Sequence, residues 1–182
     1  MMPPHPLLDT RRLHLRPCTA SDLDALYRLW NDPAVRRYLF DDEAVERAFV
    51  TRQIAASEAD FAAHGYGLWV IEEQAAGALV GFGGYRPFFD PPELQLLIGL
   101  APPCWGQGFA TEACHALLRY GFDGAGFDAI TACADAPNAA SIRLIERLGF
   151  RFRDRGLRDG LDTICYTLAR ADYAPPPRHT YP

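Results

Sequence analysis

The sequence predicts a single α/β domain built on one mixed, largely antiparallel sheet flanked by helices. The chain has 182 residues, of which 49% are hydrophobic and 23% charged, as in an ordinary globular domain. Strand-like alternation and helical periodicity follow one another along it in the order β-α-α-β-β-β-α-β-α-β-β. We expect a flexible tail over 1–9, the domain over 10–170 and a Pro-rich tail over 171–182.

The N-terminal part shows a strand and then a helix with clear end signals. Leu13 and Leu15 alternate with polar residues, which indicates a half-buried strand. Thr19 and Asp22 have the spacing of a capping box, and apolar residues follow in the i, i+3, i+4, i+7 pattern. We therefore expect a helix that ends before Pro33.

A second, longer helix is expected to begin at Asp41 or Asp42 and to reach about Ala63. The rest of the chain alternates between strands and helices. Strands are expected over 66–72, 78–85, 93–100 and 128–134, helices over 108–122 and 138–148, and a closing hairpin over 150–155 and 163–168.

Charge and cysteine content narrow the possible classes. The net charge is −5, so a broad nucleic-acid surface is not expected. The uncharged stretch Leu94–Thr111 contains prolines and glycines, which indicates a strand and a loop rather than a membrane span. The cysteines form no C-x-x-C pair, so we expect neither a zinc site nor a disulfide framework, but reduced thiols in a cytoplasmic protein. They are Cys18, Cys104, Cys114, Cys133 and Cys165.

The segment Leu94–Ala113, LQLLIGLAPPCWGQGFATEA, carries the strongest functional signal. A buried strand runs into Pro-Pro, then a glycine-rich loop, then a helix. Glycines allow close backbone approach, and a helix start offers unpaired N–H groups, so the segment predicts a phosphate cradle. The alternative is a turn that holds nothing. The P-loop, G-x-x-x-x-G-K-[ST], is excluded because no lysine follows this loop. The dinucleotide-binding fingerprint, G-x-G-x-x-G, is excluded because the residue three beyond Gly108 is Thr111 rather than glycine or alanine.

Three segments resemble the GNAT superfamily of acyl-CoA-dependent N-acyltransferases, and most of all its branch of ribosomal-protein N-terminal acetyltransferases. They are LHLRPCTASDLDALYRLWNDPAV (13–35), WGQGFATEA (105–113) and NAASIRLIERLGFR (138–151). The superfamily's loop pattern, [QR]-x-x-G-x-[GA], is met at Gly108 and Ala110, and Trp105 replaces its first residue as is familiar in this branch. The resemblance spans about Thr10–Ala169. It implies the GNAT fold, with acetyl-CoA as co-substrate.

The resemblance also implies how the coenzyme is held. Backbone N–H groups of the glycine loop would bind its pyrophosphate, and the backbone of Leu100 would bind the pantetheine arm like an added strand. Asn138 is expected to cap its helix and to bind a pantetheine amide. The expected coenzyme contacts are Leu100, Trp105, Gly106, Gln107, Gly108, Phe109, Ala110, Thr111 and Asn138.

Ser141 and Glu93 are the expected catalytic residues. Ile145 or a neighbour stands where superfamily members often have a tyrosine acid, so Ser141 is expected to protonate the thiolate, as in the enzymes it resembles. The alternative is a serine that only satisfies the first helical turn. Gln95 occupies the position of a common family glutamate and cannot accept a proton, whereas Glu93 faces the same side of the strand. Glu93 is therefore the expected general base, and an exposed strand-start carboxylate is the alternative.

The sequence thus predicts an N-acetyltransferase that moves an acetyl group to a primary amine by direct attack in a ternary complex. The acceptor is expected to be a small molecule or a peptide, with a protein α-amine favoured by the resemblance and Arg86 or Asp90 as candidate contacts. A non-catalytic acyl-CoA sensing module and a pure interaction domain are the alternatives. We expect a monomer or homodimer, with neither a metal nor a membrane partner.

Overall fold

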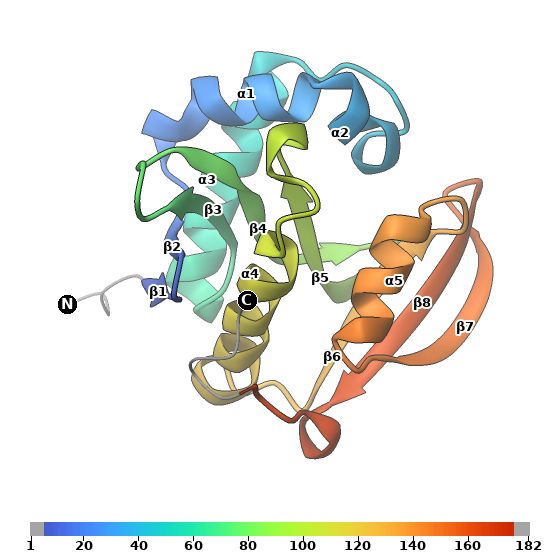
Figure 1. Cartoon of the computed structure of the whole chain (residues 1–182). Coiled ribbons are helices and arrows are strands. Elements are labelled where there is room, and N and C mark those ends of the chain that lie inside the picture. Colours follow the sequence, from blue (N-terminus) through green and yellow to red (C-terminus); the bar gives the residue numbers. More distant parts are fainter. Residues whose placement is uncertain (1–5, 177–182) are drawn as a thin grey trace.

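The computed structural model describes residues 6–176 and contains one eight-stranded sheet in the order β1-β2-β3-β4-β5-β6-β8-β7 (Figure 1). Its strands are β1 (Leu8–Asp9), β2 (Leu13–Pro17), β3 (Leu68–Glu73), β4 (Leu79–Phe88), β5 (Glu93–Leu100), β6 (Ala129–Asp135), β7 (Arg151–Arg158) and β8 (Leu161–Ala169). The helices are α1 (Leu23–Asn31), α2 (Pro33–Leu39), α3 (Arg47–His64), α4 (Phe109–Arg119) and α5 (Ala139–Arg147). The predicted fold class is confirmed.

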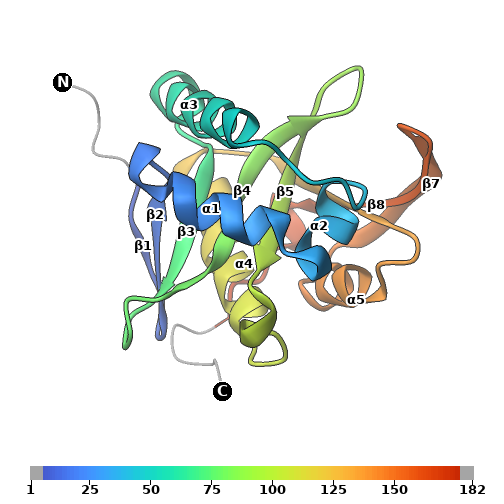
Figure 2. The same ribbon diagram turned by 90° about the horizontal axis from the view of Figure 1, so that it is seen from above.

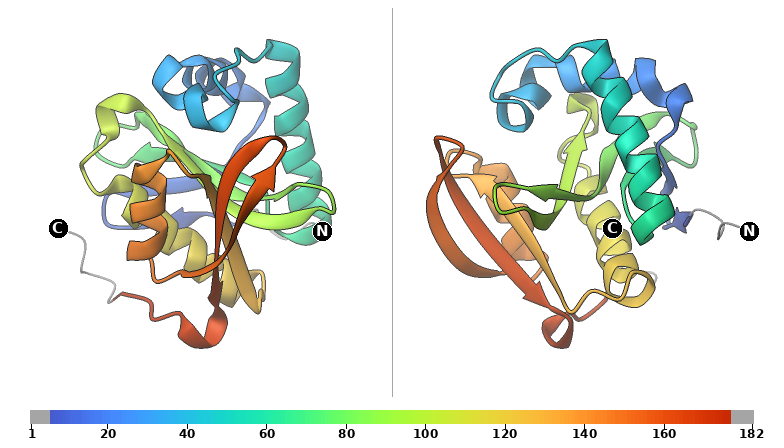
Figure 3. Two further views of the ribbon diagram at one scale, coloured as in Figure 1. Left: turned by 90° about the vertical axis from the view of Figure 1, so that its right-hand side faces the viewer. Right: turned by 180° about the vertical axis from the view of Figure 1, so that it is seen from behind.

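Helices cover the sheet on both faces, and each face has its own apolar core. Helices α1, α2 and α3 pack over one face, where Trp30, Val50 and Phe82 belong to one buried cluster. Helices α4 and α5 pack over the other, where Leu117 and Ile145 belong to a second cluster. Figure 2 shows α1 crossing the strands from above, and the right-hand view of Figure 3 shows α3 in front of the sheet.

The sheet is antiparallel except where β5 meets β6. That parallel contact consists of the single register pair Gln95↔Thr131 in the described residues, whereas β4 and β5 pair over their whole length from Gly81↔Leu100 to Phe88↔Glu93. Beyond Gln95, β5 therefore has an unpaired edge toward β6. This opening separates the two halves of the sheet and positions the site described below.

The structure contains elements that the sequence pattern did not reveal. Helix α2 follows α1 at once, because Asp32 caps it by accepting from Ala34 N at 2.9 Å and Pro33 occupies its first position. Helix α3 starts at Arg47 rather than at Asp41 or Asp42. Both aspartates have positive φ, +53° and +63°, which is incompatible with a helix start.

The ends of the described chain are better anchored than the expected tails. Leu8–Asp9 pairs with β2, and Pro6 O accepts a hydrogen bond from Trp69 Nε1 at 2.9 Å. Tyr173 lies 4.9 Å from Phe122 between ring centroids. The remaining parts of both expected tails, 1–5 and 177–182, lie outside the described residues. No helix within 6–176 is long and apolar enough to span a membrane.

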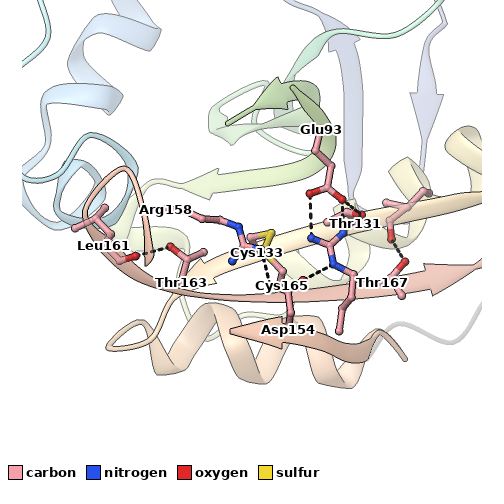
Figure 4. The surroundings of a disulfide bond; sticks show 11 residues. Glu93, Thr131, Cys133, Asp154, Arg158, Leu161, Thr163, Cys165 and Thr167 are labelled. Carbon is pink, nitrogen blue, oxygen red and sulfur yellow. Dashed lines mark hydrogen bonds and ion pairs between the residues drawn. A yellow bond between two sulfur atoms is a disulfide. The ribbon is translucent and has the colours of Figure 1, made fainter. Parts of the chain in front are cut away.

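The expectation of five reduced thiols is wrong for Cys133 and Cys165, which form a disulfide (Figure 4). The two residues are separated by 32 positions in the sequence, a spacing that matches no cysteine motif. They meet because β6 and β8 pair in antiparallel register with Cys133 opposite Cys165, at a Cα–Cα distance of 4.1 Å. Cys18, Cys104 and Cys114 are free, as expected.

Candidate active site

A cavity of about 840 Å³ lies at the opening between β5 and β6. Its walls come from α1 and α2 on one side and from α5 and the β7–β8 turn on the other, and its floor from β4, β5 and β6. Ser141 and all but one of the expected coenzyme contacts line it. Those contacts are Leu100, Trp105, Gly106, Gly108, Phe109, Ala110, Thr111 and Asn138.

The glycine loop has the geometry of an anion cradle. Gly108 is the N-cap of α4 with φ +79°, and Gly106 has φ +73° with no atom within 4 Å of where a Cβ would stand. The first backbone bond of the helix runs from Glu112 N to Gly108 O at 3.1 Å. The N–H groups of residues 109–111 thus precede the helical ladder and point to the helix end, where the dipole is positive. The loop therefore fits a pyrophosphate.

Arg12 and Glu112 hold the glycine loop in place through contacts that the sequence analysis did not predict. Arg12 Nη1 donates to Gln107 O at 2.9 Å, Arg12 Nε donates to Glu112 Oε2 at 2.7 Å, and the guanidinium lies 4.5 Å over the ring of Phe109. Glu112 is fully buried and also accepts from Thr10 Oγ1 at 2.6 Å. The expected coenzyme contact Gln107 does not line the cavity, since its side chain donates to Pro103 O.

The free edge of β5 offers backbone groups to a bound chain. Ala101 N donates to Val80 O at 2.9 Å, so the alternation of an antiparallel ladder turns the backbone groups of Ile98 and Leu100 toward β6. The carbonyl of Leu100 is already used, because Trp105 Nε1 donates to it at 2.8 Å. This leaves the N–H of Leu100 and both groups of Ile98 for a pantetheine arm.

Asn138 and Ser141 stand at the start of α5. The side chain of Asn138 accepts from Ser141 N at 3.2 Å, so the predicted N-cap is confirmed. This cap uses the Asn138 carbonyl oxygen and the Ser141 backbone, and leaves the Asn138 NH₂ and the Ser141 hydroxyl for other partners. Both side chains line the cavity, opposite the free edge of β5.

Glu93 faces the same side of β5 as Gln95, as the alternation predicts, but it does not line the cavity within the described chain. Arg153 forms an ion pair with its carboxylate, and Thr131 Oγ1 donates to it at 3.1 Å (Figure 4). These hydrogen bonds, that of Arg153 foremost, lower the pKa of Glu93. A carboxylate held in this way is ionised but a weaker proton acceptor.

Asp135, at the end of β6, is a carboxylate that no sequence pattern selects. It lines the cavity, and burial, helped by the charge of Asp41, raises its pKa. If the register Gln95↔Thr131 is extended by four residues, Asp135 stands level with Gly99, across the opening from the free edge of β5. A raised pKa and this placement make Asp135 a candidate proton acceptor.

A strand edge, a glycine cradle and a serine-bearing helix around one cavity define a site for a nucleotide-linked acyl carrier. Over residues 12–151 the chain matches the acetyltransferase (GNAT) domain family. It is 30% identical over 179 residues to the uncharacterized N-acetyltransferase p20 of Bacillus licheniformis. The aligned region covers 92% of this chain and 98% of that relative. The chain belongs to the GNAT family and is an acetyl-CoA-dependent N-acetyltransferase.

Solved structures share this fold. A putative GNAT-family acetyltransferase from Bordetella pertussis has a TM-score of 0.78 and 24% identity, over 90% of this chain and 99% of that one. Two Vibrio cholerae structures follow. A spermidine N-acetyltransferase with CoA and spermine has a TM-score of 0.71 and 20% identity over 89% and 98% of the chains. A putative ribosomal-protein-serine acetyltransferase has a TM-score of 0.72 and 20% identity, and the match covers 92% of this chain and 99% of that one. At these identities the likeness shows the fold alone.

Replacement of Gly108 by aspartate is expected to weaken CoA binding at least about tenfold, or about 1.4 kcal/mol. The new side chain would bring a negative charge to the cradle where the pyrophosphate is expected. Gly126→Asp is the control, because Gly126 has φ +77°, close to the φ +79° of Gly108, but is not among the cavity residues. A Cβ at Gly108 would meet Arg12 Nη2 at 3.4 Å, and a Cβ at Gly126 would meet nothing within 4 Å. Calorimetric titration of CoA measures both variants. Equal affinities in the two folded variants would contradict the cradle.

Proposed function

We propose that this enzyme transfers the acetyl group of acetyl-CoA to a primary amine by direct attack in a ternary complex, with an α-amine as the acceptor. The observation that carries the proposal is that the glycine cradle, the free edge of β5 and Ser141 surround one cavity. That cavity has room for an acceptor beside the coenzyme arm. The similarity to the ribosomal-protein branch supports an α-amine.

The reaction proceeds by exchange of one bond at the acetyl carbon. The ammonium loses a proton, and the free amine attacks the thioester carbonyl, so that a C–N bond forms as the C–S bond breaks. The departing thiolate takes a proton from the Ser141 hydroxyl, and the second proton that the amide nitrogen gives up returns to the Ser141 oxygen. Backbone N–H groups at the β5 edge polarise the carbonyl. The net products are the amide, CoA and one proton.

Two carboxylates are candidates for the general base, and a pair of variants separates them. Asp135→Asn is expected to lower turnover at least about tenfold at neutral pH, because an amide accepts no proton. Asp135 accepts a proton only when ionised, so activity should fall as pH drops through its raised pKa. The deficit should shrink at high pH, where solvent supplies free amine.

Glu93→Gln tests the sequence-based hypothesis in the same assay. The ion pair with Arg153 holds the Glu93 carboxylate, so this variant also removes a contact between β5 and β7. If Glu93 is the base, turnover falls and recovers with rising pH. Wild-type turnover from about pH 6 to about pH 9 in Glu93→Gln would exclude it, and the same result in Asp135→Asn would exclude Asp135.

Thiol release from acetyl-CoA with a panel of amines tests the proposed function itself. We expect at least one α-amine to be acetylated with one thiol released per amide formed. Saturable CoA binding without any acetylated amine would instead support an acyl-CoA sensing module, and an absence of CoA binding would support an interaction domain. The expected cytoplasmic location is part of this proposal.

A further inference from the structure

The floor of the cavity carries two neighbouring hydrogen-bond donors for which residues 6–176 provide no acceptor. Arg86 on β4 and Gln95 on β5 are directly opposite in register, so their side chains leave the same face of the sheet, and both line the cavity. Gln95 is 4% exposed, and its Nε2 is buried without a hydrogen-bond partner in the described chain. An unpaired buried donor costs stability unless a ligand satisfies it.

The guanidinium of Arg86 forms no salt bridge with any residue that the structure describes. Within residues 6–176, its side chain makes no ion pair or hydrogen bond, although it is half-buried at the cavity. Burial lowers the pKa of Arg86, and the charge of Asp60 offsets only part of that effect. A glutamate at position 95 would place a carboxylate directly opposite Arg86 in the register of β4 and β5. Glutamine adds no negative charge there, so the partial effect of Asp60 is not reinforced.

Asp135, the cavity carboxylate at the end of β6, lies too far along the sheet to pair with these donors. Gln95 is level with Thr131, whereas Asp135 lies four residues further along β6, about 13 Å at 3.3 Å per residue. The cavity therefore has a cationic, donor-rich floor and a separate carboxylate beside the free edge of β5. Trp30 adds another buried donor without a partner, its Nε1, to the lining.

We propose that Arg86 and Gln95 bind a carboxylate carried by the acceptor amine, so that the enzyme acetylates amino-carboxylates in preference to neutral or polycationic amines. This inference rests on the proposed function and names its substrate class. A guanidinium offers paired N–H donors that match the two oxygens of a carboxylate, and the Gln95 amide adds a third donor. The amine end then extends toward the β5 edge and Asp135.

The test compares amino acids with their own carboxamides as acceptors of acetyl-CoA. Glycine, phenylalanine and 4-aminobutyrate span different distances between amine and carboxylate, and O-phosphoethanolamine reports whether a phosphate serves instead. For at least one pair, kcat/KM for the acid should exceed that for the amide at least about tenfold. The amide has the less basic amine, so intrinsic reactivity at neutral pH favours the opposite order.

Two variants attribute the preference to these residues. Arg86→Met should lower the acid-to-amide ratio of kcat/KM at least about tenfold, chiefly through a higher KM for the preferred acid. Gln95→Glu should remove the preference as well, by placing a carboxylate beside Arg86, and it serves where Arg86→Met fails to fold. Arg52→Met, on the exposed face of α3, is the control and should leave the ratio unchanged.

The outcomes separate this inference from the proposed function. Four results would overturn the carboxylate site while acetyl transfer stands. They are equal use of acids and amides, a preference for spermidine, a preference for O-phosphoethanolamine over every amino acid, and an acid-to-amide ratio that is unchanged in both variants. If no amine is acetylated although CoA binds, the proposed function fails first.

Discussion

Replacement of Glu112 by alanine is expected to lower the free energy of unfolding by about 3–5 kcal/mol. The Glu112 carboxylate is fully buried and accepts from the Arg12 side chain, the Arg12 backbone N–H and Thr10 Oγ1. Its removal leaves the partly buried Arg12 guanidinium without its ion pair. Such a loss corresponds to a fall in Tm of about 6–20 °C in a chain of this size.

The same substitution should weaken CoA binding, because Arg12 also holds the carbonyl of Gln107 in the cradle. Glu58→Ala is the control, since Glu58 is an exposed helical glutamate whose loss should change stability by no more than about 0.5 kcal/mol. Thermal unfolding with and without CoA measures both effects. A Glu112→Ala variant as stable as Glu58→Ala would show that this ion pair does not hold the loop.

Ser141→Ala is expected to lower turnover on the order of 10²-fold while CoA affinity stays nearly constant. The hydroxyl is the proposed proton donor to the thiolate, and the contact with Asn138 uses only the Ser141 backbone N–H at 3.2 Å. The helix cap is therefore preserved, and stability should hardly change. Ser141→Thr keeps a hydroxyl and should retain part of the activity.

Asn138→Ala provides the contrast, because it removes the cap itself. It should lower stability by about 0.5–2 kcal/mol and weaken CoA binding. Paired melting and kinetic measurements on the two variants separate catalysis from capping. Wild-type turnover in Ser141→Ala would show that the thiolate obtains its proton elsewhere, and a stability loss with intact turnover would leave Ser141 a purely structural role.

Local signals in the sequence were sufficient for much of the fold. Strand β5 occupies the predicted range 93–100, and the Asn138 cap and the capping box of Thr19 and Asp22 are formed as predicted. These features depend on residues close together in the chain. The segment Asn31-Asp32-Pro33 ends α1 as predicted, but it also starts α2, which was not predicted.

The contacts that complete the site depend on long-range register, which one sequence does not reveal. Arg12 meets Glu112 across 100 positions, and Cys133 meets Cys165 only because β6 and β8 pair in one particular register. In the same way, Arg86 and Gln95 become neighbours through the pairing of β4 with β5. The sequence indicated Arg86 as a candidate acceptor contact, but it could not show that Arg86 lies opposite Gln95 in the cavity floor.

Two-substrate initial-rate kinetics, combined with mass spectrometry of the enzyme mixed with acetyl-CoA alone, tests the central claim most directly. Direct attack in a ternary complex predicts intersecting double-reciprocal lines and an enzyme that stays unacetylated until the amine is added. Parallel lines together with an acetylated enzyme that passes its acetyl group to the amine would contradict the account, since they require a covalent intermediate.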